Sequence, residues 1–150
     1  MMLIREFEEM LHEKWTEGAI PTTAIHLSTG QEAVAAGVCM NLRTTDYLNT
    51  THRGHGHIIA KGADLNGMMA EIYGKASGLC AGKGGSMHIA DLELGIIGAN
   101  GIVGAGIPIA VGAAIALDNT NKKNHKLTIQ IRQYSMNMKI MALQSVLVSW

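Results

Sequence analysis

Apolar residues recur at helical spacing at the start of the chain, with glutamate and lysine residues between them. Side chains three and four positions apart share one face of a helix, so this pattern predicts an amphipathic helix. The helix is expected to end near Gly18, because Pro21 follows soon after. The predicted apolar face consists of Leu3, Phe7, Met10, Leu11 and Trp15.

Three further helices are predicted from their end signals and composition. Residues 29–32 have Thr at the first position and Glu at the fourth, which is the pattern of a capping box, and a short apolar helix is expected to run from there to Met40. Asp64 is a suitable N-cap for a helix that Gly74 would close. The stretch 104–117 is rich in Gly and Ala and predicts a closely packed helix.

Two short strands are predicted, over residues 47–50 and 126–131, the second from its alternation of polar and apolar residues. Glycine-rich loops are expected over 74–88 and 95–106, and a polar turn over 118–126. Helices interleaved with few strands predict an open α/β layer fold. A chain of 150 residues is long enough to bury the core of one domain.

Composition excludes several classes of function. The formal net charge is zero, so the composition gives no indication of electrostatic binding to nucleic acid or to an acidic membrane. Cys39 and Cys80 form neither a disulfide framework nor a zinc knuckle, which favours reduced thiols in a cytoplasmic protein. Charged residues arrive too early for a secretion signal. The apolar stretch 102–117 is shorter than the ~20 residues of a membrane span and contains Pro108.

Residues 52–57 read His-Arg-Gly-His-Gly-His and are the first candidate for chemistry. The planar guanidinium of Arg53 suits two phosphate oxygens at once, and the glycines allow a backbone to approach a ligand closely. A histidine-rich surface turn explains the motif equally well. A zinc site using His55 and His57 is a weaker interpretation, because no third ligand is identifiable from spacing.

Residues 78–88 contain five glycine or lysine positions that invite comparison with a phosphate-binding P-loop. The comparison fails on spacing, since only three residues separate Gly78 from Gly82 and a glycine follows Lys83 where Ser or Thr should hold magnesium. A flexible loop near a site, or a subunit contact, is the better interpretation.

Residues 98–108 form a second glycine-rich motif, which does not match the dinucleotide-binding fingerprint because no glycine lies three residues after Gly106. Two interpretations stay open. Small residues here pack against a neighbouring backbone, or the backbone together with Ile102 and Val103 forms a wall for a flat ring. His26 lies alone between apolar neighbours, which is more typical of a core or loop histidine than of a catalytic one.

Taken in order, five blocks of this chain resemble the alpha subunit of the first component of 2-oxo acid dehydrogenase complexes, most closely the acetoin and pyruvate dehydrogenase branches. Five ordered blocks are more specific than any single glycine motif. They lie within residues 2–117 of the 150. The blocks are residues 2–5, 26–32, 52–56, 82–88, and 98–104 with the helix that follows to residue 117.

The resemblance implies a thiamine diphosphate site at the junction of an alpha and a beta subunit, on an incomplete thiamine-diphosphate-binding fold with helices packed on a mainly parallel sheet. It implies two catalytic histidines, His26 facing the substrate and His55 lining the active site. Arg53 would contact the diphosphate, and the backbone of Gly101 and Val103 would bond to the aminopyrimidine. The implied cofactor-binding residues are His52, Arg53, Gly101, Ile102 and Val103.

The chain departs from the family after residues 127–129 of the predicted strand. The family has a Gly-Asp-Gly motif and a later Asn there, whose oxygens bind Mg²⁺, the type of ligand that a hard cation prefers. This chain has no Asp or Glu after Asp118. Mg²⁺ is therefore expected for the family, but its binding motif is absent and no metal ligand is assigned.

The composition change near residue 130 suggests that residues 1–129 belong to a thiamine-diphosphate-binding domain and that residues 130–150 are a divergent tail. Our hypothesis is that the reading frame shifts there, because the tail holds only basic, amide, hydroxyl and apolar residues. Sequencing the gene across the codons for residues 126–140 tests this, and an unbroken frame would reject it.

The resemblance predicts an alpha subunit of a dehydrogenase acting on pyruvate, acetoin or a related 2-oxo substrate, with an acyl group passed to a lipoyl carrier. Its partners would be a beta subunit, in a heterotetramer, and a lipoyl acyltransferase component. Two alternatives stay open, an inactive relative that serves only as a subunit-docking module, and an unrelated metal hydrolase built on four histidines. Those histidines are His52, His55, His57 and His88.

We expect no dehydrogenase activity from this chain alone, because it lacks the metal-binding motif and a beta partner. The check is an assay of the purified 150-residue chain with thiamine diphosphate, Mg²⁺ and an artificial electron acceptor. Measurable turnover would contradict the expectation.

Overall fold

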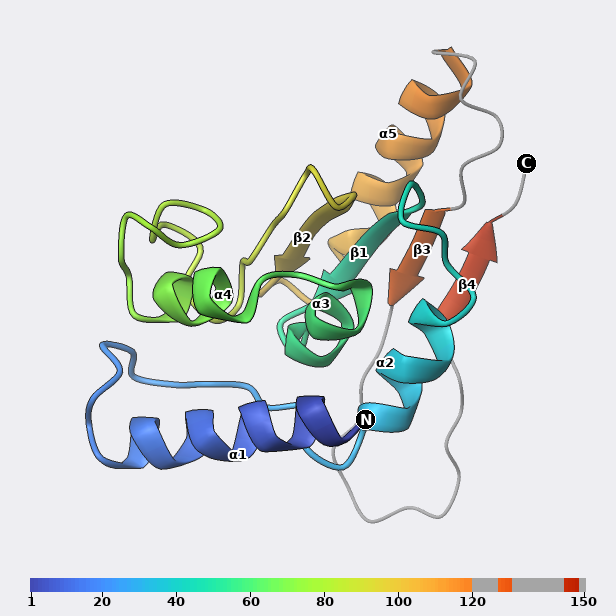
Figure 1. Ribbon diagram of the computed structural model, residues 1–150. Coiled ribbons are helices and arrows are strands. Elements are labelled where there is room, and N and C mark those ends of the chain that lie inside the picture. The colour runs from blue at the N-terminus through green and yellow to red at the C-terminus, as the bar shows by residue number, and fades with distance from the viewer. Residues whose placement is uncertain (120–126, 131–144, 149–150) are drawn as a thin grey trace.

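The computed structural model describes residues 1–119, 127–130 and 145–148 (Figure 1). The helices in these residues are α1 (Met2–Thr16), α2 (Glu32–Cys39), α3 (His55–Lys61), α4 (Leu65–Ile72) and α5 (Gly106–Asn119). The strands are β1 (Tyr47–Thr51), β2 (Ile96–Asn100), β3 (Leu127–Gln130) and β4 (Ser145–Val148). None of the described helices combines the length and apolar character that crossing a membrane requires.

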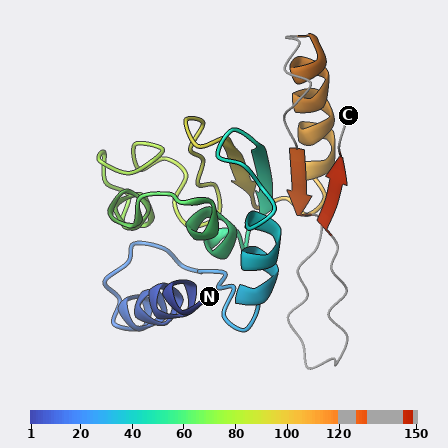
Figure 2. The ribbon, with the colours of Figure 1, turned by 45° about the vertical axis from the view of Figure 1, so that its right-hand side comes forward.

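The four described strands form one sheet in the order β2-β1-β3-β4. β1 pairs in parallel with both β2 and β3, and β4 is antiparallel to β3. Helix α5 lies on one side of the sheet, and α1 to α4 lie on the other (Figure 2). The predicted α/β class is therefore confirmed, with helices packed on a mainly parallel sheet.

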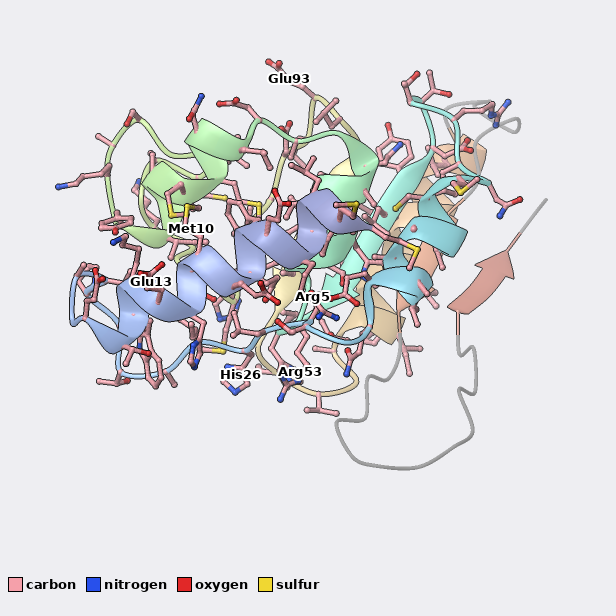
Figure 3. The ribbon with its side chains drawn as sticks, turned by 60° about the horizontal axis from the view of Figure 1, so that its bottom comes forward. Arg5, Met10, Glu13, His26, Arg53 and Glu93 are labelled. Carbon is pink, nitrogen blue, oxygen red and sulfur yellow. The ribbon has the colours of Figure 1, made fainter. Side chains whose placement is uncertain are left out.

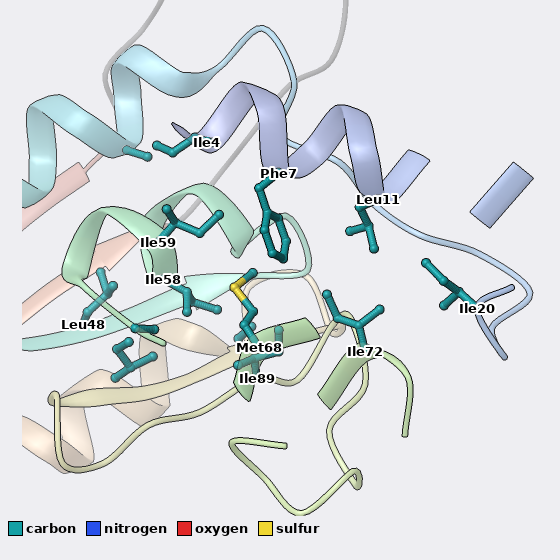
Figure 4. Close-up of a cluster of buried hydrophobic side chains, with 14 residues drawn as sticks. Ile4, Phe7, Leu11, Ile20, Leu48, Ile58, Ile59, Met68, Ile72 and Ile89 are labelled. Atoms are coloured by element: carbon teal, nitrogen blue, oxygen red, sulfur yellow. The ribbon is translucent and has the colours of Figure 1, made fainter. Parts of the chain in front are cut away.

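Side chains of the strands alternate between the two faces of the sheet and pack in a hydrophobic cluster on each face. Leu48 and Ile96 are fully buried in the main core with α1, α3 and α4 (Figure 4). Their neighbours Tyr47 and Ile97 pack instead with Ala110 of α5. Successive strand residues point to opposite faces, so each strand contributes to both layers.

Strand β2 carries an irregularity where it pairs with β1. Leu48 is opposite Ile96, but Asn49 is opposite Gly98, so β2 has one extra residue at this point. Such a bulge bends a strand and re-aims the residues that follow it. Beyond the bulge, Ala99 joins the same core as Ile96.

Helix α1 is present as predicted, but its buried face is rotated relative to the prediction. Leu3 and Met10 are 54% and 42% exposed, whereas Ile4 and Glu8 are buried beside Phe7 and Leu11. The prediction was wrong there because the charged residue Glu8 lies on the buried face of the helix. Its carboxylate has partners in the interior, which are described below.

The predicted capping box at α2 is wrong. The N-cap is Gln31, with no side-chain cap, and Glu32 accepts hydrogen bonds from Gly30 N and from the Arg5 guanidinium of α1. The hydrogen bond from Arg5 lowers the pKa of Glu32 to about 2. Glu32 therefore ties α2 to α1 through an ion pair. By contrast, Asp64 caps α4 as predicted, accepting from Gly67 N at 2.7 Å.

Two elements were predicted as loops. Helix α3 begins inside the expected histidine turn at residues 52–57 and continues to Lys61. Gly56 is needed for packing, because a Cβ there would lie 3.0 Å from Ser28 Oγ and 3.3 Å from Ala35 and Ile4 atoms. Strand β2 lies in the expected loop 95–106 and is formed by pairing with β1. The predicted polar turn lies almost entirely outside the described residues.

Candidate functional site

The candidate site lies at the carboxyl ends of the parallel strands β1 and β2. Thr51 and Asn100, the last residues of these strands, are opposite each other in the register. The chain therefore enters residues 52–54 and 101–103 from adjacent points on one edge of the sheet, where α5 also begins. Ligands of open α/β sheets bind outside this edge. A small pocket here is lined by Thr50, Thr51, Asn100, Ile102, Gly104, Gly106 and Ile107.

Arg53 lies on the first of these segments and is half-buried. Its Nη1 donates to the carbonyl of Leu27 at 2.6 Å, which fixes the guanidinium beside the segment that carries His26. Among the described residues no carboxylate lies within ion-pair distance of Arg53. The charge and the remaining N–H groups of Arg53 are therefore free to bind an anion.

His26 and His52 lie against each other close to Arg53, and Figure 3 shows His26 beside Arg53. Their ring centroids are 5.0 Å apart and the rings meet edge to face at 86°. Burial, followed by the neighbouring Arg53 and His55, lowers the pKa of His26; burial, followed by His26 and Arg53, lowers the pKa of His52. Both rings are therefore neutral at pH 7.

The Nδ1 atoms of His26 and His52 are buried and have no hydrogen-bond partner among the described residues. Buried polar atoms in native proteins are nearly always paired with protein, water or a ligand. Two unpaired nitrogens beside a free guanidinium mark a place for a polar ligand.

His55, which the resemblance expects to line the active site, lies in the interior of the structure. The ring is fully buried, with Nδ1 3.0 Å from Glu8 Oε1 and Nε2 3.0 Å from both the carbonyl oxygen and Oγ of Ser86. Glu8 also accepts from the backbone N and the Oγ of Ser28. His55 therefore connects α1 to the loop that contains Ser86, and its geometry fits a positioning role.

The segment that follows β2 presents apolar side chains to solvent. Ile102 and Val103 are 72% and 76% exposed. The Ile102 N–H donates to Asn100 Oδ1 at 2.8 Å, which closes a tight turn directly after the strand. Next to it, the ring of His88 lies over Gly101, since a Cβ on Gly101 would be 3.2 Å from Cε1 and Nε2 of that ring.

The glycine-rich loop after α4 is organised by Glu71, which is fully buried. Its carboxylate accepts four backbone hydrogen bonds, from Cys80 at 2.7 Å, Gly82 at 2.8 Å, Gly84 at 2.6 Å and Gly85 at 3.1 Å. Burial opposes ionisation, but these amides outweigh it and hold the pKa of Glu71 below its usual value. The loop thus folds around an acid of the protein itself.

The glycines of this loop are explained by the same acid. A Cβ on Gly78 would lie 2.5 Å from Glu71 backbone and side-chain atoms, and one on Gly82 would lie 2.6 Å from the Gly74 backbone. Sequence reasoning missed both Glu71 and Glu8. The signal that could have found them is their position: each lies at helical spacing from the buried apolar residues of its helix.

The described residues give the zinc hydrolase alternative no support. No group of three or more His, Cys, Asp or Glu side chains in them is arranged to hold a metal ion. Two of the four histidines of that alternative have other surroundings, since His55 is hydrogen-bonded to Glu8 and Ser86 and His57 is buried in α3.

Comparison with known proteins places these features in a family. The sequence model of the family described as "Dehydrogenase E1 component" matches residues 1–130. The chain is 57% identical over 124 residues to the alpha subunit of acetoin:2,6-dichlorophenolindophenol oxidoreductase of Bacillus subtilis, covering 83% of this chain and 37% of that protein. The corresponding subunit of Cupriavidus necator is 56% identical over 116 residues, covering 77% and 34%.

A pyruvate dehydrogenase relative matches over the same region. The E1 component subunit alpha of Zymomonas mobilis is 45% identical over 117 residues, which cover 77% of this chain and 33% of that subunit. The chain spans about a third of the length of these curated relatives. The family match includes both segments at the sheet edge and the loop held by Glu71. The chain belongs to the dehydrogenase E1 component family.

Proposed function

We propose that this chain supplies the alpha-subunit side of a thiamine diphosphate site in a dehydrogenase acting on pyruvate, acetoin or a related 2-oxo substrate. The observation that carries the proposal is the pairing of Thr51 with Asn100, because it brings the strand ends that lead into Arg53 and into residues 101–103 to adjacent points on one edge of the sheet. A cofactor with an anionic end and a flat apolar end requires two such features close together.

The residues present fit this cofactor. Arg53 has donors free for diphosphate oxygens, while Ile102 and Val103 offer exposed apolar surface to a ring. The buried, unpaired nitrogens of His26 and His52 are in reach of the same edge and would gain a partner. When bound, thiamine diphosphate supplies a carbon nucleophile and an electron sink for 2-oxo chemistry.

The chain's own residues then act by binding, orienting and holding protons. Neutral His26 donates from one ring nitrogen and accepts at the other, so it can orient a substrate carbonyl and hold a proton at Nδ1. His52 packs against His26 and fixes the plane of its ring. His55 acts indirectly. Its ring holds the loop through Ser86, and Glu8 fixes the orientation of that ring.

The proposal concerns residues 1–129 and assigns no metal ligand. The family's Mg²⁺ ligands would follow β3, and the chain has no Asp or Glu after Asp118. We propose a beta subunit as the partner that completes the site, in a heterotetramer, and a lipoyl acyltransferase component as the acceptor of the acyl group. Free Cys39 and Cys80 fit a cytoplasmic location.

One observation favours the alternative of a docking module without catalysis. Helix α5 exposes apolar side chains that the described residues do not cover, and exposed apolar patches mark interaction surfaces. These are Ile107, Ile109, Val111 and Ile115, at 44%, 39%, 54% and 58% exposure. Such a surface serves subunit contact whether or not the cofactor binds, so cofactor binding is the property that separates the two functions.

Replacing Arg53 by glutamine is expected to weaken thiamine diphosphate binding at least about tenfold, because a charge-assisted hydrogen bond to an anion contributes roughly 1.5–3 kcal/mol. Arg53→Lys keeps the charge but loses the forked pair of N–H donors, so its affinity should lie between those of Arg53→Gln and the unaltered chain. Binding is measured by titration calorimetry on the full chain with Mg²⁺ present. Lys75→Gln, the loss of an exposed positive charge in the loop after α4, is the matched control and should bind normally.

The outcomes separate the two functions. Equal affinity in Arg53→Gln and the unaltered chain would remove Arg53 from the site. If the unaltered chain forms a complex with a beta subunit but shows no cofactor binding in that complex, the docking function replaces the catalytic one. Circular dichroism of each variant establishes that its fold is intact.

A further inference from the structure

His88 is an exposed side chain on a rigidly held piece of loop, at the edge where the candidate site lies. We infer that His88 is a further binding residue of this site, contacting the heterocyclic part of thiamine diphosphate beside Gly101. The inference rests on the proposed function and adds to it a residue on the loop after α4, which neither strand end contributes.

The backbone on both sides of His88 is anchored. Two residues earlier, Ser86 is held by the buried ring of His55 through both its carbonyl oxygen and its Oγ. One residue later, Ile89 is fully buried and its carbonyl accepts from Ala99 N of β2 at 2.9 Å. A side chain between two such anchors has a defined position relative to the sheet.

Hydrogen bonds to Glu71 and within the loop also fix the path of its backbone. Glu71 holds Gly84 and Gly85 through Oε1, and Cys80 Sγ accepts from Ala90 N at 3.0 Å. A Cβ on Gly84 would lie 2.5 Å from the His88 carbonyl oxygen, so glycine is what lets the loop close at this point. The buried acid therefore determines where the backbone of His88 lies.

The ring itself is aimed at the second segment of the site. It occupies the space that a side chain on residue 101 would fill, with Cε1 and Nε2 both 3.2 Å from that position. An imidazole here offers a donor or an acceptor, as well as a flat face. Its neighbour on the site is Gly101, whereas Arg53 lies on the other segment, after β1.

This placement predicts selectivity between two probes. His88→Ala should weaken thiamine diphosphate binding about tenfold, the size of one good hydrogen bond, and leave binding of inorganic diphosphate unchanged. Arg53→Gln should weaken binding of both probes, because it removes the contact to the anion. His88→Gln keeps a donor and an acceptor and should recover part of the loss. Both probes are titrated into the full chain with Mg²⁺.

A double-mutant cycle tests whether His88 acts from its place over Gly101. Gly101→Ala should displace the ring and give a loss similar to that of His88→Ala, and the double variant should show no further loss. Additive losses would contradict an effect through the ring position. Since His88 is exposed, its replacement should leave the melting temperature unchanged, and a lowered one would assign the effect to the fold.

The possible failures are distinguishable. Unaltered affinity for thiamine diphosphate in His88→Ala overturns the role of His88 and leaves the site at Arg53 standing. Equal weakening of inorganic diphosphate also overturns it, because His88 would then act on the anion. No binding of thiamine diphosphate by the unaltered chain, either alone or in complex with a beta subunit, overturns the proposed function and this inference together.

Discussion

Glu71→Ala is expected to lower the free energy of unfolding by about 4 kcal/mol, since a donor left without its partner costs roughly 1–3 kcal/mol when buried and four part-buried amides lose theirs. Glu71→Gln should also destabilise the protein, because its NH₂ group would face N–H donors. The measurement is urea unfolding followed by circular dichroism. Glu93→Ala removes an exposed acid that points to solvent (Figure 3) and should change stability by less than about 0.5 kcal/mol.

The amides also allow a rescue experiment. Added formate should stabilise Glu71→Ala and not Glu71→Gln, because a carboxylate that binds only the folded chain raises its stability and the alanine variant alone leaves room for one. If Glu71→Ala unfolds at the same urea concentration as the unaltered chain, the loop has another organiser. The expected loss would then be refuted.

The second large effect concerns pH and depends on His57. This ring is 1% exposed, and neither of its nitrogens has a partner among the described residues. Burial lowers the pKa of His57 from 6.5 to about 4. Below pH 6.5 the unfolded chain therefore binds a proton that the folded chain does not. The contribution to stability is complete above pH 6.5 and is lost as the pH falls to 4, a loss of about 3 kcal/mol.

His57→Leu should remove this dependence and raise stability at pH 7 by about 1–3 kcal/mol, because an unpaired buried polar group is replaced by an apolar one of similar size. The experiment compares the unfolding free energies of the two proteins between pH 7 and 4. The lowered pKa values of Glu32 and Glu71 are common to both proteins and cancel in the difference. His12→Asn, at an exposed position of α1, is the control. A constant difference between the two proteins across this range would contradict the assignment.

Local patterns in the sequence predicted the elements whose signals are local. The first helix, the Asp64 cap, β1 and the small-residue helix each depend on residues within a few positions of one another, and all four are present. Helix α3 and strand β2 contain glycines that read as loop signals. In the structure Gly56 permits close packing against Ala35, and Gly98 adopts at the bulge a backbone conformation with φ of 150°, which L side chains rarely adopt; both needs are set by distant residues.

The candidate site could be predicted as a set of segments but not as a network. The resemblance implied that Arg53 and residues 101–103 serve one site, and the register between β1 and β2 places the strand ends that lead into these two segments side by side. The buried acids Glu8 and Glu71 were missed because charge is ordinarily a sign of exposure. Their partners lie up to 47 residues away, at His55 for Glu8, so no nearby pattern identifies them.

The extra residue in β2 determines which way the end of that strand faces. Without the bulge, strict alternation of the same residues would give Ala99 and Ile96 opposite orientations, and Asn100 would turn toward the core in place of Ala99. Deleting Ile97 would remove the extra residue and leave Ala99 two positions after Ile96, so Ala99 and Asn100 would keep their sides of the sheet. Inserting one residue between Gly98 and Ala99 would instead reverse both orientations and turn the Asn100 amide toward the core, which would remove the turn that presents Ile102.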